Sequence, residues 1–216
     1  YYIIITKIYI FKRIIYKMLI FYDLESTGLN PYHDKITEIC LIKQIPMEFN
    51  DEKFSTLINP EKTIPAIVTK ITGIDEDLVK DKLTFNQISN QLLHFINYNL
   101  EPGKTAYFIA HNNEGYDKIM FNCHLTSAGI DVSNYNWIHL DTLLLAKKLY
   151  PHFKRYNLKS LCEQLGVEVL DAHRAEADTI MLKNIFYKMI LDMEEKTVNK
   201  FDQLVNDPKM IYDYYH

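Results

Sequence analysis

Two carboxylates stand two residues apart at the end of an apolar stretch near the start of the chain. Asp23 and Glu25 follow the sequence MLIFY at residues 18–22. Side chains of a β-strand alternate between its faces, so residues i and i+2 project together. Burying two like charges side by side is unfavourable unless a cation neutralises them, and carboxylate oxygens suit Mg²⁺ or Mn²⁺. The alternative is a strand end in solvent, which is the more common outcome for an isolated pair.

Two further patterns place acidic residues at the edges of predicted elements. Asn112 and Asp117 form an N-x4-D pattern after the apolar residues TAYFIA, and His173 and Asp178 form an H-x4-D pattern at the start of the last long predicted helix. Sites in open α/β sheets gather beyond strand ends, although Asn and Asp are also ordinary helix caps. Four carboxylates and one histidine, each at an element edge, favour one shared site over three unrelated caps.

The elements that would position these residues follow from hydrophobic periodicity and turn signals. The predicted strands are 18–24, 36–45, 54–58, 105–110 and 137–140, and the predicted helices are 64–72, 84–98, about 115–128, 142–149, 158–165 and about 174–194. Three successive strands, followed by strands that alternate with helices, predict an α/β fold with a mixed sheet covered by helices. We expect one domain at 18–195, preceded by a leader at 1–17 and followed by a C-terminal tail or helix at 196–216.

The order and spacing of the three patterns resemble the DEDD superfamily of 3′-to-5′ exonucleases, in the DnaQ-like subgroup whose fifth residue is histidine (DEDDh). Its ribonuclease H-like fold has three antiparallel strands followed by parallel strands. Within the superfamily the chain looks most similar to the TREX (three-prime repair exonuclease) type, over about residues 18–190. The resemblance lies in DLESTGL at 23–29, KITEICLI at 35–42, ITGI at 71–74, AHNNEGYD at 110–117, RYNLKSL at 155–161 and AHRAEAD at 172–178. Asn30 and Gly115 depart from the TREX pattern, which puts the grip on substrate in doubt.

The resemblance implies a chemistry and a set of site residues. Asp23, Glu25, Asp117 and Asp178 would hold two Mg²⁺ ions, with Mn²⁺ as a substitute, and His173 would deprotonate the attacking water. The enzyme would hydrolyse single-stranded or frayed DNA from its 3′ end by a two-metal mechanism and release nucleoside 5′-monophosphates. The residues expected to contact substrate are Glu25, Ser26, Thr27, Gly28, Leu29, Ile71, Asn112, Tyr116, His173 and Asp178.

Several of these contacts leave alternatives open. Gly28 permits a tight turn, and backbone amides around it could hold the terminal nucleotide. Leu29 and Ile71 could wedge against the last base, since such stacking tolerates any sequence, or they could be ordinary core residues. Tyr116 could contact the scissile phosphate or simply pack at the start of a helix.

A basic stretch between residues 147 and 159 also suits a polyanionic substrate. It contains no acidic residue, and aromatic side chains are interleaved with the basic ones. Such mixtures suit single-stranded nucleic acid, although a solvated helix end would look similar. The residues are Lys147, Lys148, Lys154, Arg155 and Lys159, with Tyr150, Phe153 and Tyr156.

The composition is that of an ordinary globular protein. Of 216 residues, 48% are hydrophobic and 24% charged, which excludes collagen, a disordered chain and a polytopic membrane protein. The net charge of −4 does not indicate a nucleic-acid binder, but four of the acidic residues are the candidate metal ligands. The separated cysteines Cys40, Cys123 and Cys162 argue against a disulfide framework or zinc site and favour buried thiols in a reducing compartment. We therefore expect an intracellular protein, in the cytoplasm or the nucleus.

Residues 1–17 are apolar but are interrupted by four basic side chains. Their longest uncharged run is six residues, far too short to span a bilayer, so we expect no membrane association. We expect Met18 to be the true start, or the leader to be dispensable. The alternative is an extra edge strand or helix packed on the domain.

The main expectation is a DNA exonuclease. The alternatives within the class are a polymerase proofreading subunit and a 3′–5′ exoribonuclease. A non-catalytic nucleic-acid-binding module is the alternative from another class. The intact set of five residues argues against the module, because a decayed site usually loses members. A homodimer is implied by the TREX resemblance alone.

Overall fold

The structure is a computed structural model that describes residues 17–46, 50–171 and 173–192. Nearly all of the predicted leader (1–17) and the whole predicted tail (196–216) lie outside the described residues, as does the predicted domain end at 195. Within the described part, no helix is long and apolar enough to cross a membrane.

Five strands form one mixed sheet in the order β3-β2-β1-β4-β5. β1 (Met18–Ser26), β2 (Ile36–Gln44) and β3 (Asp51–Leu57) pair antiparallel, whereas β4 (Ala106–Ala110) and β5 (Trp137–Asp141) continue the sheet parallel to β1. The loop at residues 27–35 returns the chain for antiparallel pairing of β2, while the helices after β3 provide the long crossover that parallel pairing requires. The predicted mixed sheet is therefore confirmed.

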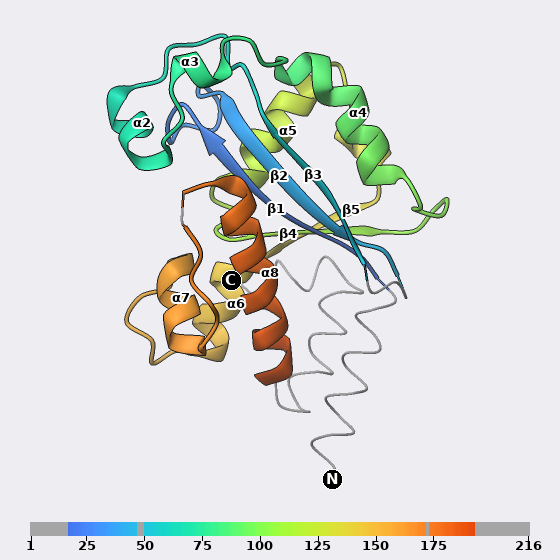
Figure 1. Ribbon diagram of the computed structural model, residues 1–216. Coiled ribbons are helices and arrows are strands. Elements are labelled where there is room, and N and C mark those ends of the chain that lie inside the picture. Colours follow the sequence, from blue (N-terminus) through green and yellow to red (C-terminus); the bar gives the residue numbers. More distant parts are fainter. Residues whose placement is uncertain (1–16, 47–49, 172, 193–216) are drawn as a thin grey trace.

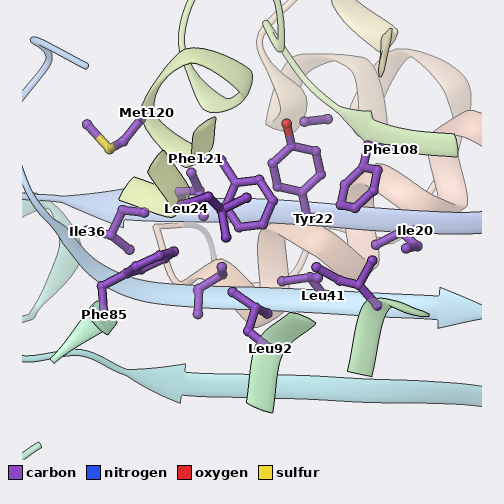
Figure 2. Close-up of a cluster of buried hydrophobic side chains, with 14 of the residues drawn as sticks. Ile20, Tyr22, Leu24, Ile36, Leu41, Phe85, Leu92, Phe108, Met120 and Phe121 are labelled. Atoms are coloured by element: carbon purple, nitrogen blue, oxygen red, sulfur yellow. The ribbon is translucent and has the colours of Figure 1, made fainter. Parts of the chain in front are cut away.

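One face of the sheet packs on α4 (Phe85–Asn97) and α5 (Asp117–Ser127). Figure 2 shows this core, in which the ring of Tyr22 on β1 meets Phe108 of β4 and Phe121 of α5. Both helices turn apolar residues toward the sheet, and for α4 the helical spacing of the sequence predicts this face.

The other face packs on α8 (Ala175–Asp192), which lies across β1 and β2 beside α6 (Thr142–Leu149) and α7 (Leu158–Leu165) (Figure 1). Leu19 and Phe21 of β1 belong to the core formed with α8. Because side chains of a strand alternate, the later odd-numbered residues of β1 share this face. The strand therefore aims the D-x-E carboxylates toward the layer that contains α8.

The remaining elements are α2 (Ala66–Thr72), α3 (Glu76–Val79) and the 3₁₀ turn η1 (Val132–Asn134). The helix predicted at 64–72 begins two residues later, because Pro65 takes an extended backbone at the N-cap position. The sequence patterns do not predict α3 or η1, since four and three residues are too short to reveal a hydrophobic period. The strand predicted at 54–58 begins earlier, as the bounds of β3 show.

The three cysteines are free thiols. Cys40 and Cys162 are buried, and burial raises the pKa of each thiol to about 11. Cys123 is only half-buried, because it lies beside the exposed Thr126 and off the buried stripe of α5. The expectation of three buried thiols is therefore correct for two of them.

Candidate active site

Three acidic side chains meet where β1 ends and α8 begins. Asp23 and Glu25 come from β1, Asp178 comes from the first turn of α8, and one carboxylate oxygen of each lies within 4.8 Å of the others. The pairing of β1 with β2 becomes irregular between Glu25 and Ser26. Such irregularities re-aim side chains at sites and end regular pairing, and here one follows the D-x-E directly. The structure thus brings the D-x-E and H-x4-D patterns together.

Burial and mutual repulsion hold these carboxyl groups toward their protonated forms. Burial, with the charges of Asp178 and Glu38, raises the pKa of Glu25 to about 8, while Arg174 opposes the shift. Burial also raises the pKa of Asp23 and of Asp178. A cation bound among these oxygens would offset the repulsion and favour the ionised forms. A donor set made only of carboxylate oxygens fits a hard divalent cation.

Asp117 approaches this cluster from the opposite helical layer. It is the first residue of α5 and is buried, but it lies outside the group of three whose oxygens are within 4.8 Å. After burial itself, the charge of Asp117 is the largest cause that raises the pKa of Asp23, so the two carboxylates are electrostatic neighbours. The four predicted ligands therefore share one end of the sheet, and three of them form the tight group.

Asp141, absent from the predicted site, holds the loop that carries Asp117. Its buried carboxylate accepts hydrogen bonds from the backbone N–H groups of Asn112 (3.1 Å), Glu114 (3.1 Å) and Leu143 (2.8 Å). Asp141 therefore caps α6 and fixes the loop at the same time. An Asp directly before a predicted helix is the signal that could have identified it.

The two asparagines of this loop have different roles. Asn112 is exposed and takes a left-handed backbone conformation (φ 65°), which asparagine tolerates better than most residues. An added Cβ at Gly115 would lie 2.9 Å from Asn112 Oδ1, so this departure from the TREX pattern leaves room for the asparagine side chain. Asn113 is buried instead, where it accepts a hydrogen bond from the Tyr22 hydroxyl and donates to the carbonyl of Leu140 (3.0 Å).

His173 lies two residues before α8 in a left-handed backbone conformation (φ 70°), with an exposed side chain. Its backbone N–H donates to Asp178 Oδ2 (2.9 Å), and the N–H of Asp178 donates to the carbonyl of Arg174 (3.0 Å). These bonds hold the first turn of α8 together and place His173, the predicted general base, next to Asp178, a predicted ligand.

Asp34 organises the loop after β1. Its carboxylate accepts hydrogen bonds from the Thr27 hydroxyl (3.0 Å) and the Asn30 backbone N–H (2.9 Å), and it forms an ion pair with Lys62 (2.7 Å). A Cβ added at Gly28 would lie 2.5 Å from Asp34 Oδ2. Since Gly28 does not have a positive φ, the close approach of this carboxylate explains the glycine better than the expected turn conformation.

The hydroxyl of Tyr116 closes the same loop against α5. It donates to the carbonyl of Gly28 (2.6 Å) and contacts Ser26 Oγ, and burial raises the pKa of Tyr116 to about 12, so the phenol stays protonated at neutral pH. The amide of Thr27 donates to the carbonyl of Lys35 (2.8 Å), and that of Gly28 donates to Ser26 Oγ (3.3 Å). The amides expected to receive a nucleotide are therefore already engaged, and the packing alternative for Tyr116 agrees with its hydrogen bonds.

Leu29 and Ile71 are both exposed, at 89% and 51% of their surface. The alternative that both are core residues is therefore wrong. Ile67, one turn before Ile71 on α2, is also exposed, at 63%. Apolar side chains held outward on a hydrogen-bonded loop and on a short helix are suited to contact a flat apolar group such as a base.

The basic stretch runs from the end of α6 through a loop to α7, and Lys154 and Arg155 are exposed in that loop. The rings of Tyr150 and Phe153 stack on each other at 4.8 Å, and the Tyr156 hydroxyl donates to the carbonyl of Tyr150 (2.7 Å). These aromatic side chains pack against the core under α7. The aromatic side chains of the expected binding surface therefore pack inside the protein, whereas its basic side chains are exposed.

His111 ties this basic loop to the site. Its Nε2 lies 2.7 Å from the carbonyl of Tyr156, and its Nδ1 lies 3.0 Å from Thr142 Oγ1. A carbonyl can only accept, so Nε2 carries a proton. Burial lowers the pKa of His111, in keeping with a neutral ring. The loop is therefore anchored to the residue that precedes Asn112.

A mixed five-stranded sheet with carboxylates clustered at one end is the architecture of ribonuclease H-like nucleases. Residues 20–186 match the family described as exonuclease (RNase_T), and the chain belongs to this family.

Curated relatives include larger bacterial enzymes. A PolC-type DNA polymerase III from Caldanaerobacter subterraneus subsp. tengcongensis is 33% identical over 183 residues, which is 85% of this chain and 12% of that protein. The 3′-5′ exonuclease DinG of Bacillus subtilis is 30% identical over 183 residues, which is 84% of this chain and 18% of that protein. The chain therefore spans only a small part of these relatives.

Solved structures show the same fold. A structure of exonuclease I superposes with a TM-score of 0.72 at 18% identity, over 88% of this chain and 43% of that one. The zinc-bound form of an E. coli ExoI–ssDNA complex gives the same values. Sequence identity this low establishes the fold alone.

Proposed function

We propose that this chain is a DEDDh-type exonuclease domain that hydrolyses DNA from its 3′ end and releases nucleoside 5′-monophosphates. The observation that carries the proposal is the group of Asp23, Glu25 and Asp178 oxygens within 4.8 Å, in a chain that belongs to the exonuclease family. The buried Asp117 supplies a fourth carboxylate at the same end of the sheet.

The acidic cluster fits a pair of divalent cations. Asp23, Glu25, Asp117 and Asp178 would hold two Mg²⁺ or Mn²⁺ ions, and bound cations would relieve the repulsion and loss of hydration that raise the pKa of these half-buried or buried acids. Bound cations would neutralise charge on the leaving oxygen and make water a better nucleophile. The related ExoI–ssDNA complex is a zinc-bound form, which agrees with a cation site in that fold.

His173 would take the proton from the attacking water. Its side chain is exposed, so it has room to turn toward a bound substrate. Its backbone is held through Asp178, so such a turn would leave the ligand in place. Histidine changes protonation near neutral pH, which suits a general base.

The terminal nucleotide would lie between the loop after β1 and α2. The exposed Leu29 and Ile71 would contact the last base without regard to its identity. Asn112 is exposed on the loop before Asp117, and its side chain would contact the substrate there. Ser26, Thr27, Gly28 and Tyr116 would act by holding the shape of this loop.

The basic loop would bind the backbone of the strand farther from its end. Exchanging Lys154 and Arg155 for glutamate should raise the KM for single-stranded DNA about tenfold at low salt, with kcat nearly unchanged. The difference from the wild type should shrink as salt rises, because phosphate contacts release counterions. Steady-state kinetics at several salt concentrations measure this effect. An unchanged KM would remove the loop from the substrate path.

Divalent cations should stabilise the protein more at high pH than at low pH. Glu25 keeps its proton in the folded state up to about pH 8, whereas its ordinary pKa is 4.5. Without a cation, the stability contributed by Glu25 is therefore present below its ordinary pKa and falls as the pH rises toward 8. A bound cation requires ionised ligands and reverses this loss. At one fixed Mn²⁺ concentration, near 100 times the Kd at pH 8, we expect Tm to rise by about 5 °C or more at about pH 8, and by less at about pH 6, where protonated ligands weaken binding.

Scanning fluorimetry with Mn²⁺ or with EDTA measures this effect, and Asp23→Asn serves as the variant that loses it. An equal shift at both pH values, or an equal shift in Asp23→Asn, would contradict cation binding at the acidic cluster.

A proofreading domain of a DNA polymerase is the second candidate, favoured by the identity to PolC-type polymerases. The TREX resemblance, the homodimer it implies and the preference for DNA over RNA stay predictions. The proposed exonuclease domain spans residues 18–195.

The deciding test is digestion of 5′-labelled DNA and RNA oligonucleotides with free or blocked 3′ ends, in Mg²⁺, Mn²⁺ or EDTA. We expect stepwise shortening from free 3′ ends only, and only with a cation. Equal cleavage of blocked ends would overturn the exonuclease proposal, and binding without cleavage in either metal would support a non-catalytic module.

A further inference from the structure

A fifth acidic side chain, that of Glu38, lies at the candidate active site and is not one of the predicted ligands. Glu38 of β2 is buried and stands directly opposite Glu25 in the antiparallel pairing of the two strands. Its Oε2 accepts hydrogen bonds from Arg174 Nε (3.1 Å) and from the backbone N–H of Ala175 (3.0 Å), and its Oε1 accepts from Arg174 Nη2 (2.7 Å). Both carboxylate oxygens of Glu38 therefore accept hydrogen bonds from the segment that carries His173 and Asp178.

The negative charge of Glu38 is unfavourable for the acidic cluster unless a positive charge compensates it. The charge of Glu38 raises the pKa of Asp23, Glu25 and Asp178, so it adds to the repulsion that a cation must overcome. Arg174 brings a positive charge to the same place and lowers the pKa of Glu25. In this ion pair, Arg174 at the start of α8 neutralises the buried charge of Glu38 on β2.

The geometry of the pair fixes orientation as well as charge. Two parallel hydrogen bonds from the planar guanidinium hold Arg174 in one direction, and the bond from the Ala175 amide caps the first turn of α8. The carbonyl of Arg174 accepts from the N–H of Asp178, and His173 precedes Arg174 directly. An anchor at residue 174 therefore holds the backbone to which both His173 and Asp178 are attached.

We propose that Glu38 and Arg174 are a positioning pair, which locks the start of α8 onto β2 and so sets Asp178 and His173 against the ligands of β1. This inference rests on the proposed function. Neither residue is a catalytic residue or a metal ligand in this scheme. Their loss should weaken cation binding and lower kcat, while KM for DNA changes little.

Arg174→Lys is the most informative variant, because it keeps the positive charge and loses the bidentate hydrogen-bond geometry. The Arg174 side chain is half exposed, so the substitution is tolerable for folding. Glu38→Gln removes the charge from the other partner. Glu176→Gln is the matched control, since Glu176 lies in the same first turn of α8 but pairs with Lys53 (2.5 Å) on the exposed surface.

Calorimetric titration with Mn²⁺ and steady-state kinetics measure the effect. We expect Arg174→Lys to weaken Mn²⁺ affinity and lower kcat by about 10- to 100-fold each, with part of kcat restored at high Mn²⁺. The double variant with Glu38→Gln should be little worse than either single variant, because the two act as one unit. The control should stay within about twofold of the wild type.

A merely structural pair would lower Tm but leave Mn²⁺ affinity unchanged at a temperature at which the variant is folded, and that result for Arg174→Lys would overturn the inference. Equal losses in Glu176→Gln would overturn it as well. If wild-type protein has no nuclease activity, the proposed function fails, whereas the Mn²⁺ titration still decides whether the pair positions the acidic cluster.

Discussion

Asp178→Asn should lower kcat on the order of 10³-fold or more while leaving the fold intact. A metal ligand supplies several kcal/mol of charge stabilisation to the reaction, and each 1.4 kcal/mol is about tenfold in rate. The amide oxygen of asparagine can still accept the backbone N–H of His173, so the start of α8 keeps its hydrogen bond. The metal-free variant should be at least as stable as the wild type at about pH 8, because one of several clustered charges is gone.

Three measurements separate these effects for Asp178→Asn: kcat on a 3′-labelled oligonucleotide, Mn²⁺ affinity by calorimetry, and Tm in EDTA. Asp77→Asn is the control, because Asp77 is an exposed carboxylate whose ion pair with Lys80 lies on the surface of α3. Activity close to that of the wild type in Asp178→Asn would exclude this carboxylate from the reaction, whatever its distance from Asp23.

His173→Asn should lower kcat by about 10²- to 10⁴-fold with cation affinity unchanged. Asparagine is the suitable substitute because the residue has φ 70°, a conformation that asparagine adopts more readily than alanine. The variant therefore removes the imidazole without adding backbone strain at the start of α8.

His94→Asn is the matched control for this variant, because His94 is exposed on α4, which covers the opposite face of the sheet. A His173→Asn variant that retains kcat within about threefold would assign the proton transfer to another group. A variant that loses Mn²⁺ affinity would instead indicate that His173 acts on the ligands.

Three acidic residues that are not predicted ligands hold segments next to the predicted ligands. Asp34 organises the loop after β1, Asp141 holds the loop before Asp117, and Glu38 anchors the segment before Asp178. All three accept backbone N–H hydrogen bonds, and two of them also pair with a cationic side chain. Carboxylates thus serve two purposes at this end of the sheet: some would bind cations, and others fix the loops that present them.

The whole-chain charge is a poor guide to the substrate of such a protein. The formal net charge of −4 includes the four carboxylates predicted to be ligands, three of which are clustered, and bound divalent cations would compensate them where the phosphate of a nucleic-acid substrate would lie. The exposed Lys154 and Arg155 add a local positive field on a loop that His111 ties to the site. Local charge, set by tertiary contacts, is therefore more informative than the sum.

Features that depend on neighbours along the chain can be predicted from the amino-acid sequence alone. Alternation in β1 places Asp23 and Glu25 on one face, and helical spacing predicts α4 and α8 within a few residues of their ends. Backbone geometry repeats every two residues in a strand and about every 3.6 in a helix, so these patterns are visible without any tertiary contact. The three spaced motifs are local in the same sense.

The contacts between these local features are set by tertiary packing. Packing of α8 across β1 and β2 brings Asp178 to Asp23, and it gives Glu38 its partner Arg174, although nothing in the spacing of the chain relates them. The same holds for the exposure of Leu29 and for the aromatic rings under α7, which the sequence pattern assigned to substrate. Contacts between distant segments depend on how whole elements pack, and a pattern read over a few residues contains no information about that packing.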